Sequence, residues 1–242
     1  MPAFDPAFDI AYEAGSFPPA FEVPTFPGGL IQRYITSLSA AGLMYYSLSE
    51  PVFIGNNDFE VECPSVTVST ATQSIMSCSM DLIFKVLTIS GVVWVLVGDG
   101  SAWQRQINSG VSIDDGESHV VGFRKTSSTY EILVDDVVVT STTDPDPVSV
   151  IIDRIGLSSS GYFTGELYDV KIWTGGDRNT GTMLHIPIDE DWKTSTDLHD
   201  AEGNVVGSAI NITEDEAEFY TLIDNGTAWQ SATRTIPIAG GA

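Results

Sequence analysis

The stretch Phe163-Thr-Gly-Glu-Leu-Tyr-Asp-Val-Lys-Ile-Trp173 decides the fold, because its residues alternate in the manner of a β-strand. The alternation divides the stretch into two faces, one with Phe163, Leu167, Asp169, Lys171 and Trp173 and the other with Glu166, Tyr168, Val170 and Ile172. Apolar groups on both sides of one strand predict a position inside a two-sheet sandwich.

Two more alternating segments precede it, His119-Val-Val-Gly-Phe-Arg124 and Tyr130-Glu-Ile-Leu-Val-Asp-Asp136, and a polar turn at 125–129 joins them as a hairpin. In this order the three segments resemble the laminin-G-like, concanavalin A-like lectin jelly roll, over residues 43–173. The resemblance implies an all-β fold, a two-sheet antiparallel jelly-roll sandwich. It does not imply one activity, because this fold has sugar-binding, protein-binding, calcium-binding and hydrolytic members.

Composition agrees with a mostly β protein. The chain has 242 residues, of which 43% are hydrophobic, and it is rich in Val, Ile, Thr and Ser. Ten basic against 33 acidic residues give a net charge of −23, which argues against nucleic acid or an anionic membrane as a partner. The acidic surface serves solubility or, alternatively, attracts divalent cations or a basic partner. We expect no signal peptide and no membrane insertion, since the longest apolar run, 92–97, is short.

The first residues differ from the rest of the chain. Residues 1–29 hold six of the 12 prolines and five of the 11 phenylalanines, with no Lys or Arg. We divide the chain into an extended arm at 1–33 and a lectin-like jelly-roll domain at 34–242, with its core at 43–175 and C-terminal strands at 183–238. The arm is either a disordered linker or an anchor on partner subunits. As an anchor it would bury Phe4, Phe8, Phe17, Phe21 and Phe26.

Two later segments resemble lectin-like jelly rolls of tailed-bacteriophage structural proteins. They are Leu184-His-Ile-Pro-Ile-Asp-Glu190 and Asp200-Ala-Glu-Gly-Asn-Val-Val-Gly207. The resemblance implies a virion structural protein made in the host cytoplasm, a head decoration or fibre component or a tail fibre component. Its partners would then be other virion proteins and copies of itself, with host-surface glycans as a candidate ligand. A collar or decoration protein without any ligand is the architectural alternative.

Sugar recognition needs an exposed aromatic ring beside hydrogen-bonding side chains. The best candidate group is Trp103 with Gln104 and Arg105, near the turn at 98–101, and Tyr162 is the second. Burial of Trp103 under a loop is the alternative. Trp94 and Trp173 lie in apolar strands, and we expect both in the core.

Calcium is the one cofactor that the resemblance suggests, and otherwise we expect none. Its candidate ligands are loop carboxylates, each of which could instead make a turn: Asp99, Asp114, Asp115, Asp135 and Asp136. The two cysteines, Cys63 and Cys78, are expected on neighbouring strands as free thiols.

Catalysis has one candidate, the acids of Asp58-Phe-Glu-Val-Glu62, because alternate acids on a strand approach the spacing that a retaining glycosidase uses. The segment lacks the E-x-D-x-x-E order of glucanases with this fold, and we expect Glu60 and Glu62 to face solvent. His119, His185 and His199 lack metal-ligand spacing, and we expect His119 and His185 in structural roles. The sequence therefore predicts no enzyme. The alternative is a secreted glycan-binding lectin or a glycoside hydrolase of the same fold.

Overall fold

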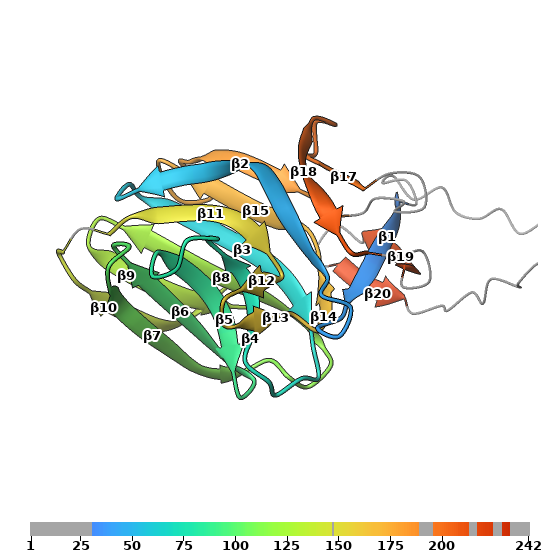
Figure 1. The fold of residues 1–242 in the computed structure, drawn as a ribbon, viewed down its shortest axis with the longest axis horizontal. Coiled ribbons are helices and arrows are strands. Elements are labelled where there is room, and N and C mark those ends of the chain that lie inside the picture. The colour runs from blue at the N-terminus through green and yellow to red at the C-terminus, as the bar shows by residue number, and fades with distance from the viewer. Residues whose placement is uncertain (1–30, 147, 189–195, 213–216, 225–228, 233–242) are drawn as a thin grey trace, which may run out of the picture.

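A computed structural model describes residues 31–146, 148–188, 196–212, 217–224 and 229–232, with side chains from residue 38 to residue 212 within these ranges. The predicted all-β antiparallel sandwich is confirmed: every regular element in the described ranges is a strand (Figure 1). In these ranges we find no helix with the length and apolar character needed to cross a membrane. The predicted arm residues Phe4, Phe8, Phe17, Phe21 and Phe26 and the predicted strand 235–238 lie outside the described residues.

The first sheet has the order β10-β9-β8-β3-β14-β1-β19-β20, with β15 paired to β3 and β16 paired to β15. Its strands are β1 Ile31–Leu38, β3 Phe59–Val66, β8 Ser118–Thr126, β9 Thr129–Val134, β10 Val137–Thr143, β14 Gly165–Leu167, β15 Val170–Thr174, β16 Thr182–Ile186, β19 Ala217–Asp224 and β20 Trp229–Ala232.

The second sheet has the order β17-β18-β2-β11-β4-β5-β6-β7. Its strands are β2 Tyr45–Gly55, β4 Gln73–Ser77, β5 Phe84–Ile89, β6 Val92–Gly98, β7 Trp103–Ser112, β11 Val150–Ile155, β17 Asp197–His199 and β18 Val205–Ile210. A small separate hairpin, β12 Leu157–Ser158 with β13 Gly161–Tyr162, lies against β4, where the Ser77 hydroxyl donates to the Leu157 carbonyl. In Figure 1 the second sheet and this hairpin are nearer the viewer.

The core lies between the two sheets and contains an aromatic cluster. Phe59, Phe123 and Tyr130 come from the first sheet and Phe84 from the second, with ring centroids 5.7–6.3 Å apart. All four side chains are fully buried. Since aromatic side chains bury more surface than any others, this cluster is a main contact between the sheets.

The predicted hairpin β8–β9 is confirmed, and a two-residue turn joins β9 to the next antiparallel strand, β10. The connecting residues Asp135 and Asp136 have φ values of 53° and 64°. Two successive positive φ values are typical of the tight turn that suits the twist of a hairpin, and aspartate tolerates that conformation.

The predicted strand 163–173 is interrupted. Asp169 has a φ of 52°, and the break at residues 168–169 separates β14 from β15. The extra residue reverses the alternation, so that Leu167, Val170 and Ile172 all face the core. The prediction that Leu167 shares a face with Lys171 and Trp173 is therefore wrong.

Two other predictions need correction. The strands begin earlier than the expected core boundary at residue 43, with β1 at Ile31. Cys63 and Cys78 are free and buried, as predicted, but they do not lie on neighbouring strands. Cys63 belongs to β3 of the first sheet, whereas Cys78 follows β4 of the second.

Candidate functional site

Five side chains lie on the outer side of the second sheet, the side that faces away from the core, in two contacting groups. One group is Lys85 with Trp103, and the other is Tyr45 with Arg154 and Tyr162. We call these five residues together the aromatic–basic face. Tyr45, Lys85 and Arg154 each alternate with a core residue of their own strand, so their side chains must point outward.

One end of this face is formed by Lys85 and Trp103. The Lys85 ammonium lies 5.1 Å from the centre of the Trp103 ring, within cation–π range. The same nitrogen donates to Asp81 at 2.8 Å, to the Ser159 hydroxyl at 2.6 Å and to the Ser160 hydroxyl at 3.3 Å. Its side chain is only 4% exposed, while that of Asp81 is 59% exposed. A half-buried indole ring therefore lies beside a set of polar groups that is already held in place.

The second end contains two tyrosines and an arginine. The Arg154 guanidinium lies 5.9 Å from the centre of the Tyr45 ring, and the Tyr45 and Tyr162 rings meet edge to face at 6.3 Å. All three side chains are half-buried. The hairpin that carries Tyr162 also carries Ser159 and Ser160 in its turn, so it connects this end of the face to Lys85.

The structure brings together two of the four predicted sugar-binding residues, Trp103 and Tyr162. Gln104 is exposed and donates to Asp99 at 2.8 Å, near the predicted turn. Arg105 is on the opposite side of the sheet, where its guanidinium lies 5.2 Å from the centre of the Tyr130 ring and 2.5 Å from Asp144. The cause is a register shift between Val97 and Gly98, which puts an extra residue between Trp103 and Arg105. The predicted patch of Trp103 with Arg105 is therefore wrong.

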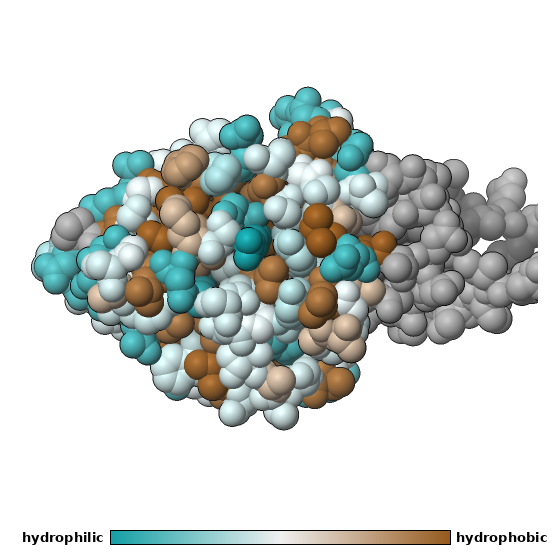
Figure 2. Space-filling model, viewed as in Figure 1, coloured by the Kyte–Doolittle hydropathy of each residue, from teal (hydrophilic) through white to brown (hydrophobic). Residues whose placement is uncertain are grey.

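The surface over the second sheet is mixed in character. Figure 2 shows this side of the molecule with apolar residues separated by polar and weakly polar ones, and without a broad apolar area. Such a surface suits a ligand that has both apolar faces and hydroxyl groups better than it suits a large protein interface.

The outer side of the first sheet is different, because a buried ion cluster covers it. Arg178, in the loop between β15 and β16, contacts Glu60 through Nε at 2.8 Å, Asp136 through Nη1 at 2.7 Å, and Glu62. Its backbone N–H donates to Glu60 at 3.0 Å. Arg124 pairs with Glu131 at 2.7 Å. We define the buried ion cluster as Glu60, Glu62, Arg124, Glu131, Asp136 and Arg178.

The predicted solvent exposure of Glu60 and Glu62 is wrong. Both do point away from the core, but Glu60 is 0% and Glu62 8% exposed because the loop with Arg178 lies over them. Burial raises the pKa of Glu62, and the nearby Arg178 and Lys171 charges oppose that rise. One guanidinium thus holds both acids, an arrangement that stabilises the fold and leaves neither carboxylate directed at open solvent.

Trp94 and Trp173 were both expected in the core, and both lie on outer faces. Trp173 is buried opposite Glu60, and Trp94 is half-buried opposite Leu87 and Asn108. Each alternates with core residues of its own strand, so an apolar strand does not by itself place a tryptophan inside.

The five aspartates predicted to bind calcium are engaged with protein groups instead. Hydrogen bonds from Ser101 lower the pKa of Asp99 to about 2, and Asp114 accepts from Ser112. Asp135 and Asp115 flank His119 at 2.8 Å and 3.2 Å, and Asp136 pairs with Arg178.

Within the described ranges no three His, Cys, Asp or Glu side chains are arranged to hold a metal. Calcium binding stays a prediction from the resemblance alone. His185 also has a structural partner, Asp169 at 2.6 Å, which supports the roles predicted for His119 and His185.

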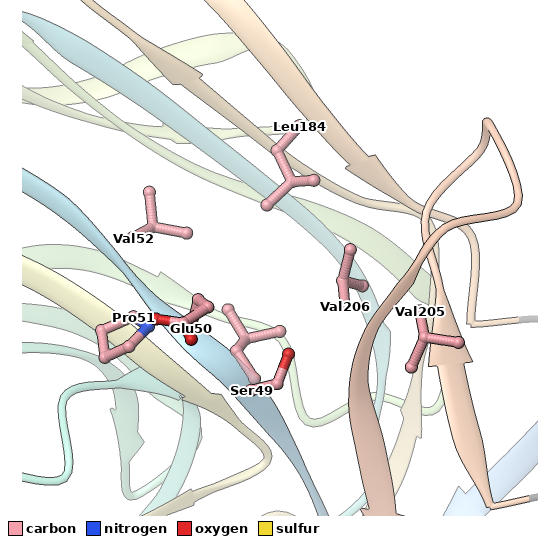
Figure 3. Close-up of a pocket in the computed structure, with 8 residues that line it drawn as sticks. Ser49, Glu50, Pro51, Val52, Leu184, Val205 and Val206 are labelled. Atoms are coloured by element: carbon pink, nitrogen blue, oxygen red, sulfur yellow. The ribbon is translucent and has the colours of Figure 1, made fainter.

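A groove of about 300 Å³ opens at one side of the sandwich (Figure 3). Its walls are Leu184 of β16, Val205 and Val206 of β18, and the segment 48–52 of β2, which is irregularly paired with β11. Among the described residues that line it, Ser49 and Glu50 are the polar ones. Because the walls are mostly aliphatic, the groove offers a sugar few hydrogen bonds.

Sequence reasoning missed Lys85, Tyr45 and Arg154. Lys85 lies between the core residues Phe84 and Val86, and Arg154 precedes the core residue Ile155. Alternation along each strand therefore predicts that the Lys85 and Arg154 side chains point away from the core. Their meeting was not readable, because it depends on the pairing of β11 with both β2 and β4.

Comparison with solved structures supports the fold. A candidate carbohydrate-binding protein from Bacteroides ovatus has a TM-score of 0.58 and 14% identity over 80% of this chain, and this chain spans 61% of its length. The mouse laminin α1 chain domains LG4-5 give a TM-score of 0.45 and 16% identity over 67% of this chain and 46% of theirs. A heptameric SAP-like pentraxin from Limulus polyphemus gives 0.46 and 11%, over 64% of this chain and 91% of its own.

No family model and no curated protein matches the sequence. At these identities the likeness shows the fold alone. The chain therefore has the all-β fold of an antiparallel two-sheet jelly-roll sandwich.

Proposed function

We propose that this protein binds carbohydrate through the aromatic–basic face, with Trp103 as the stacking ring. The observation that carries the proposal is the set of polar groups fixed beside that ring, namely Lys85, Asp81, Ser159 and Ser160. The Bacteroides ovatus protein of the same fold is itself a candidate carbohydrate-binding protein, which is compatible with this role.

The chemistry of the face suits a sugar. The apolar side of a pyranose packs on an aromatic ring, and its hydroxyl groups exchange hydrogen bonds with nearby carboxylates and hydroxyls. Because Lys85 is buried and bonded at three acceptors, little side-chain freedom is lost when a ligand binds.

We propose further that the protein has no hydrolytic activity. The acids that a glycosidase of this fold would use correspond best to Glu60 and Glu62, and both are paired with Arg178 under a loop. Release of reducing sugar by the wild type, lost on E60Q/E62Q, would contradict this and favour the hydrolase alternative.

The wider role that we propose is that of a virion structural protein anchored by its N-terminal arm. It rests on the sequence resemblance to tailed-phage proteins and on the proline- and phenylalanine-rich composition of residues 1–29. Deletion of residues 1–29 should leave the sandwich folded and abolish incorporation into particles, because a domain is stabilised by its own core. Particles that incorporate the truncated chain normally would refute the anchoring role.

Glycan binding is tested by array screening of the full chain, followed by titration of the best ligand. Trp103→Ala should weaken binding by more than about tenfold, the usual loss for an aromatic anchor. Gln106→Ala should also weaken glycan binding. Gln106 lies two strands from Lys85, in the same cross-strand row through Leu96, and because its side chain is exposed the change should not affect stability.

Phe53→Ala is the matched control, because Phe53 is an aromatic residue that is 71% exposed and lies outside the face. It should leave binding unchanged. The proposal is wrong if no glycan binds, or if Trp103→Ala and Gln106→Ala bind as the wild type does. Melting temperatures of all variants separate lost binding from lost folding.

A further inference from the structure

Resting on the proposed carbohydrate-binding function, we infer that the aromatic–basic face selects saccharides with a carboxylate group, and that Arg154 recognises that group. The inference concerns the Tyr45–Tyr162 end of the face. It starts from how the positive charges of this acidic protein are used.

Seven of the ten Lys and Arg residues have described side chains, and six of these have a carboxylate partner. The six pairs are Lys85–Asp81, Arg105–Asp144, Arg124–Glu131, Lys125–Asp58, Lys171–Asp169 and Arg178–Glu60. Arg154 alone among the seven has no carboxylate within 4.0 Å in the described part of the chain. In a protein of net charge −23, acidic residues far outnumber basic ones, so an arginine without a carboxylate partner is unexpected.

The surroundings of Arg154 keep its charge uncompensated. Its neighbours across the strands are two neutral residues, Ser47 on β2 and Ser77 on β4. The adjacent Asp153 is engaged elsewhere, since its carboxylate accepts from the backbone N–H of Ser79 at 2.6 Å and from the Ser79 hydroxyl. Among the described residues, no acid therefore pairs directly with the guanidinium.

The position of the guanidinium suits recognition of a planar anion. It lies over the Tyr45 ring at 5.9 Å, and no hydrogen bond of the described residues occupies its N–H groups. A guanidinium stacked on a ring keeps its edge available for two parallel hydrogen bonds to a carboxylate. The half-buried Tyr162, edge-on to Tyr45, offers a hydroxyl and an apolar surface beside it.

The distance between the two ends of the face fits a short saccharide. Arg154, Ser77 and Lys85 occupy one row across three adjacent strands. Adjacent strands are about 4.8 Å apart, so the backbones at Arg154 and Lys85 are separated by roughly 10 Å. Ser77 is buried under the β12–β13 hairpin, so a sugar unit on Trp103 and an acidic unit at Arg154 would lie on either side of this hairpin.

The test compares probes that differ only in whether the carboxylate is free or esterified. Polygalacturonate and its fully methyl-esterified form share one backbone, as do sialyllactose and its methyl ester. The full chain should bind the acid of the preferred pair at least about tenfold more tightly than the neutral form, as expected for one charge-assisted bidentate contact. Chondroitin sulfate against chondroitin tests sulfate as the alternative anion.

Arg154→Gln should remove the preference for the acid, so that the acid binds no more tightly than the neutral form. Arg154→Lys should restore only part of the preference, because an ammonium lacks the paired donors. Lys171→Gln is the matched control: it makes the same change in net charge on the outer side of the other sheet and should keep the preference.

The outcomes separate the inference from the proposed function. Trp103-dependent binding of neutral sugars with no preference for the acid overturns the inference alone. A preference for the acid that survives Arg154→Gln, or one directed at sulfate only, also overturns it. Absence of binding to every probe overturns both.

Discussion

The outer faces of the two sheets use arginine in opposite ways. On the first sheet, Arg178 is bonded to Glu60, Glu62 and Asp136, and its loop buries both glutamates. On the second sheet, Arg154 lies over a tyrosine ring, and no carboxylate of the described residues pairs with it. In the first case the protein satisfies its own charges, and in the second we infer that the charge serves a ligand.

The difference shows why buried charge is a poor guide to function here. The buried ion cluster contains the perturbed carboxylate, that of Glu62, and perturbed pKa values often mark active sites. Its groups are nevertheless paired with one another. The aromatic–basic face has fewer charges, but its aromatic rings and Arg154 are half-exposed, and a ligand needs such accessible groups.

The largest expected effect comes from Arg178→Met. Removal of the guanidinium takes the closest counter-charge from the buried Glu60 and Glu62, and Arg124, 3.9 Å from Glu60, does not replace its hydrogen bonds, so the change should cost about 3 kcal/mol of unfolding free energy. We take the low end of the usual range because the Arg178 side chain is 31% exposed. The melting temperature should then fall by about 6–12 °C.

Arg154→Met is the matched comparison for that experiment. It removes one charge but leaves no buried acid behind, so stability should change by less than about 0.5 kcal/mol. Equal destabilisation by the two substitutions would refute the contrast between the faces. Thermal and urea unfolding of both variants measure it directly.

An intermediate effect is expected for Lys85→Met. The buried ammonium donates to Asp81 and to two serine hydroxyls, and these charged hydrogen bonds are worth about 1–2 kcal/mol net. The loss should be smaller than for Arg178→Met, because Asp81 is 59% exposed and can be hydrated once its partner is gone. A loss as large as that of Arg178→Met would show that exposure of the remaining acid does not matter.

Much of the fold follows from alternation and turn residues. The segments 119–125 and 130–135 closely predict β8 and β9, and the Asp135-Asp136 pair marks the turn into β10. Two local irregularities defeat the same reasoning. Asp169 in a left-handed conformation reverses the faces of β15, and the extra residue beside Gly98 separates Trp103 from Arg105.

The site was less predictable than the fold, because its contacts are long-range. Trp103 and Tyr162 could be proposed from their flanking residues, but Arg154 reaches Tyr45 only through the pairing of β11 with β2. In the same way, alternation correctly predicted that the Glu60 side chain points away from the core. It could not reveal that Arg178, 118 residues later, would cover it.

The smallest effect concerns His119, near the start of β8 in the first sheet. Burial acts to lower the pKa of His119, but the hydrogen bonds from its ring to Asp135 and Asp115 outweigh burial and raise the pKa above its ordinary value. A raised pKa in the folded state means that protonated His119 stabilises the fold. The contribution is full below the unfolded value of about 6.5 and is lost as pH rises through the folded pKa.

Wild-type protein should therefore exceed His119→Gln in melting temperature at about pH 5, and the difference should shrink toward pH 8. NMR titration of the imidazole should give a pKa above about 6.5, and Asp135→Asn should lower it. His185→Gln provides a comparison with the other histidine that lies beside an aspartate, Asp169. A difference that grows with pH would mean that neutral His119 is the form the fold prefers. The aspartates around it would then act as turn formers rather than as partners of a charge.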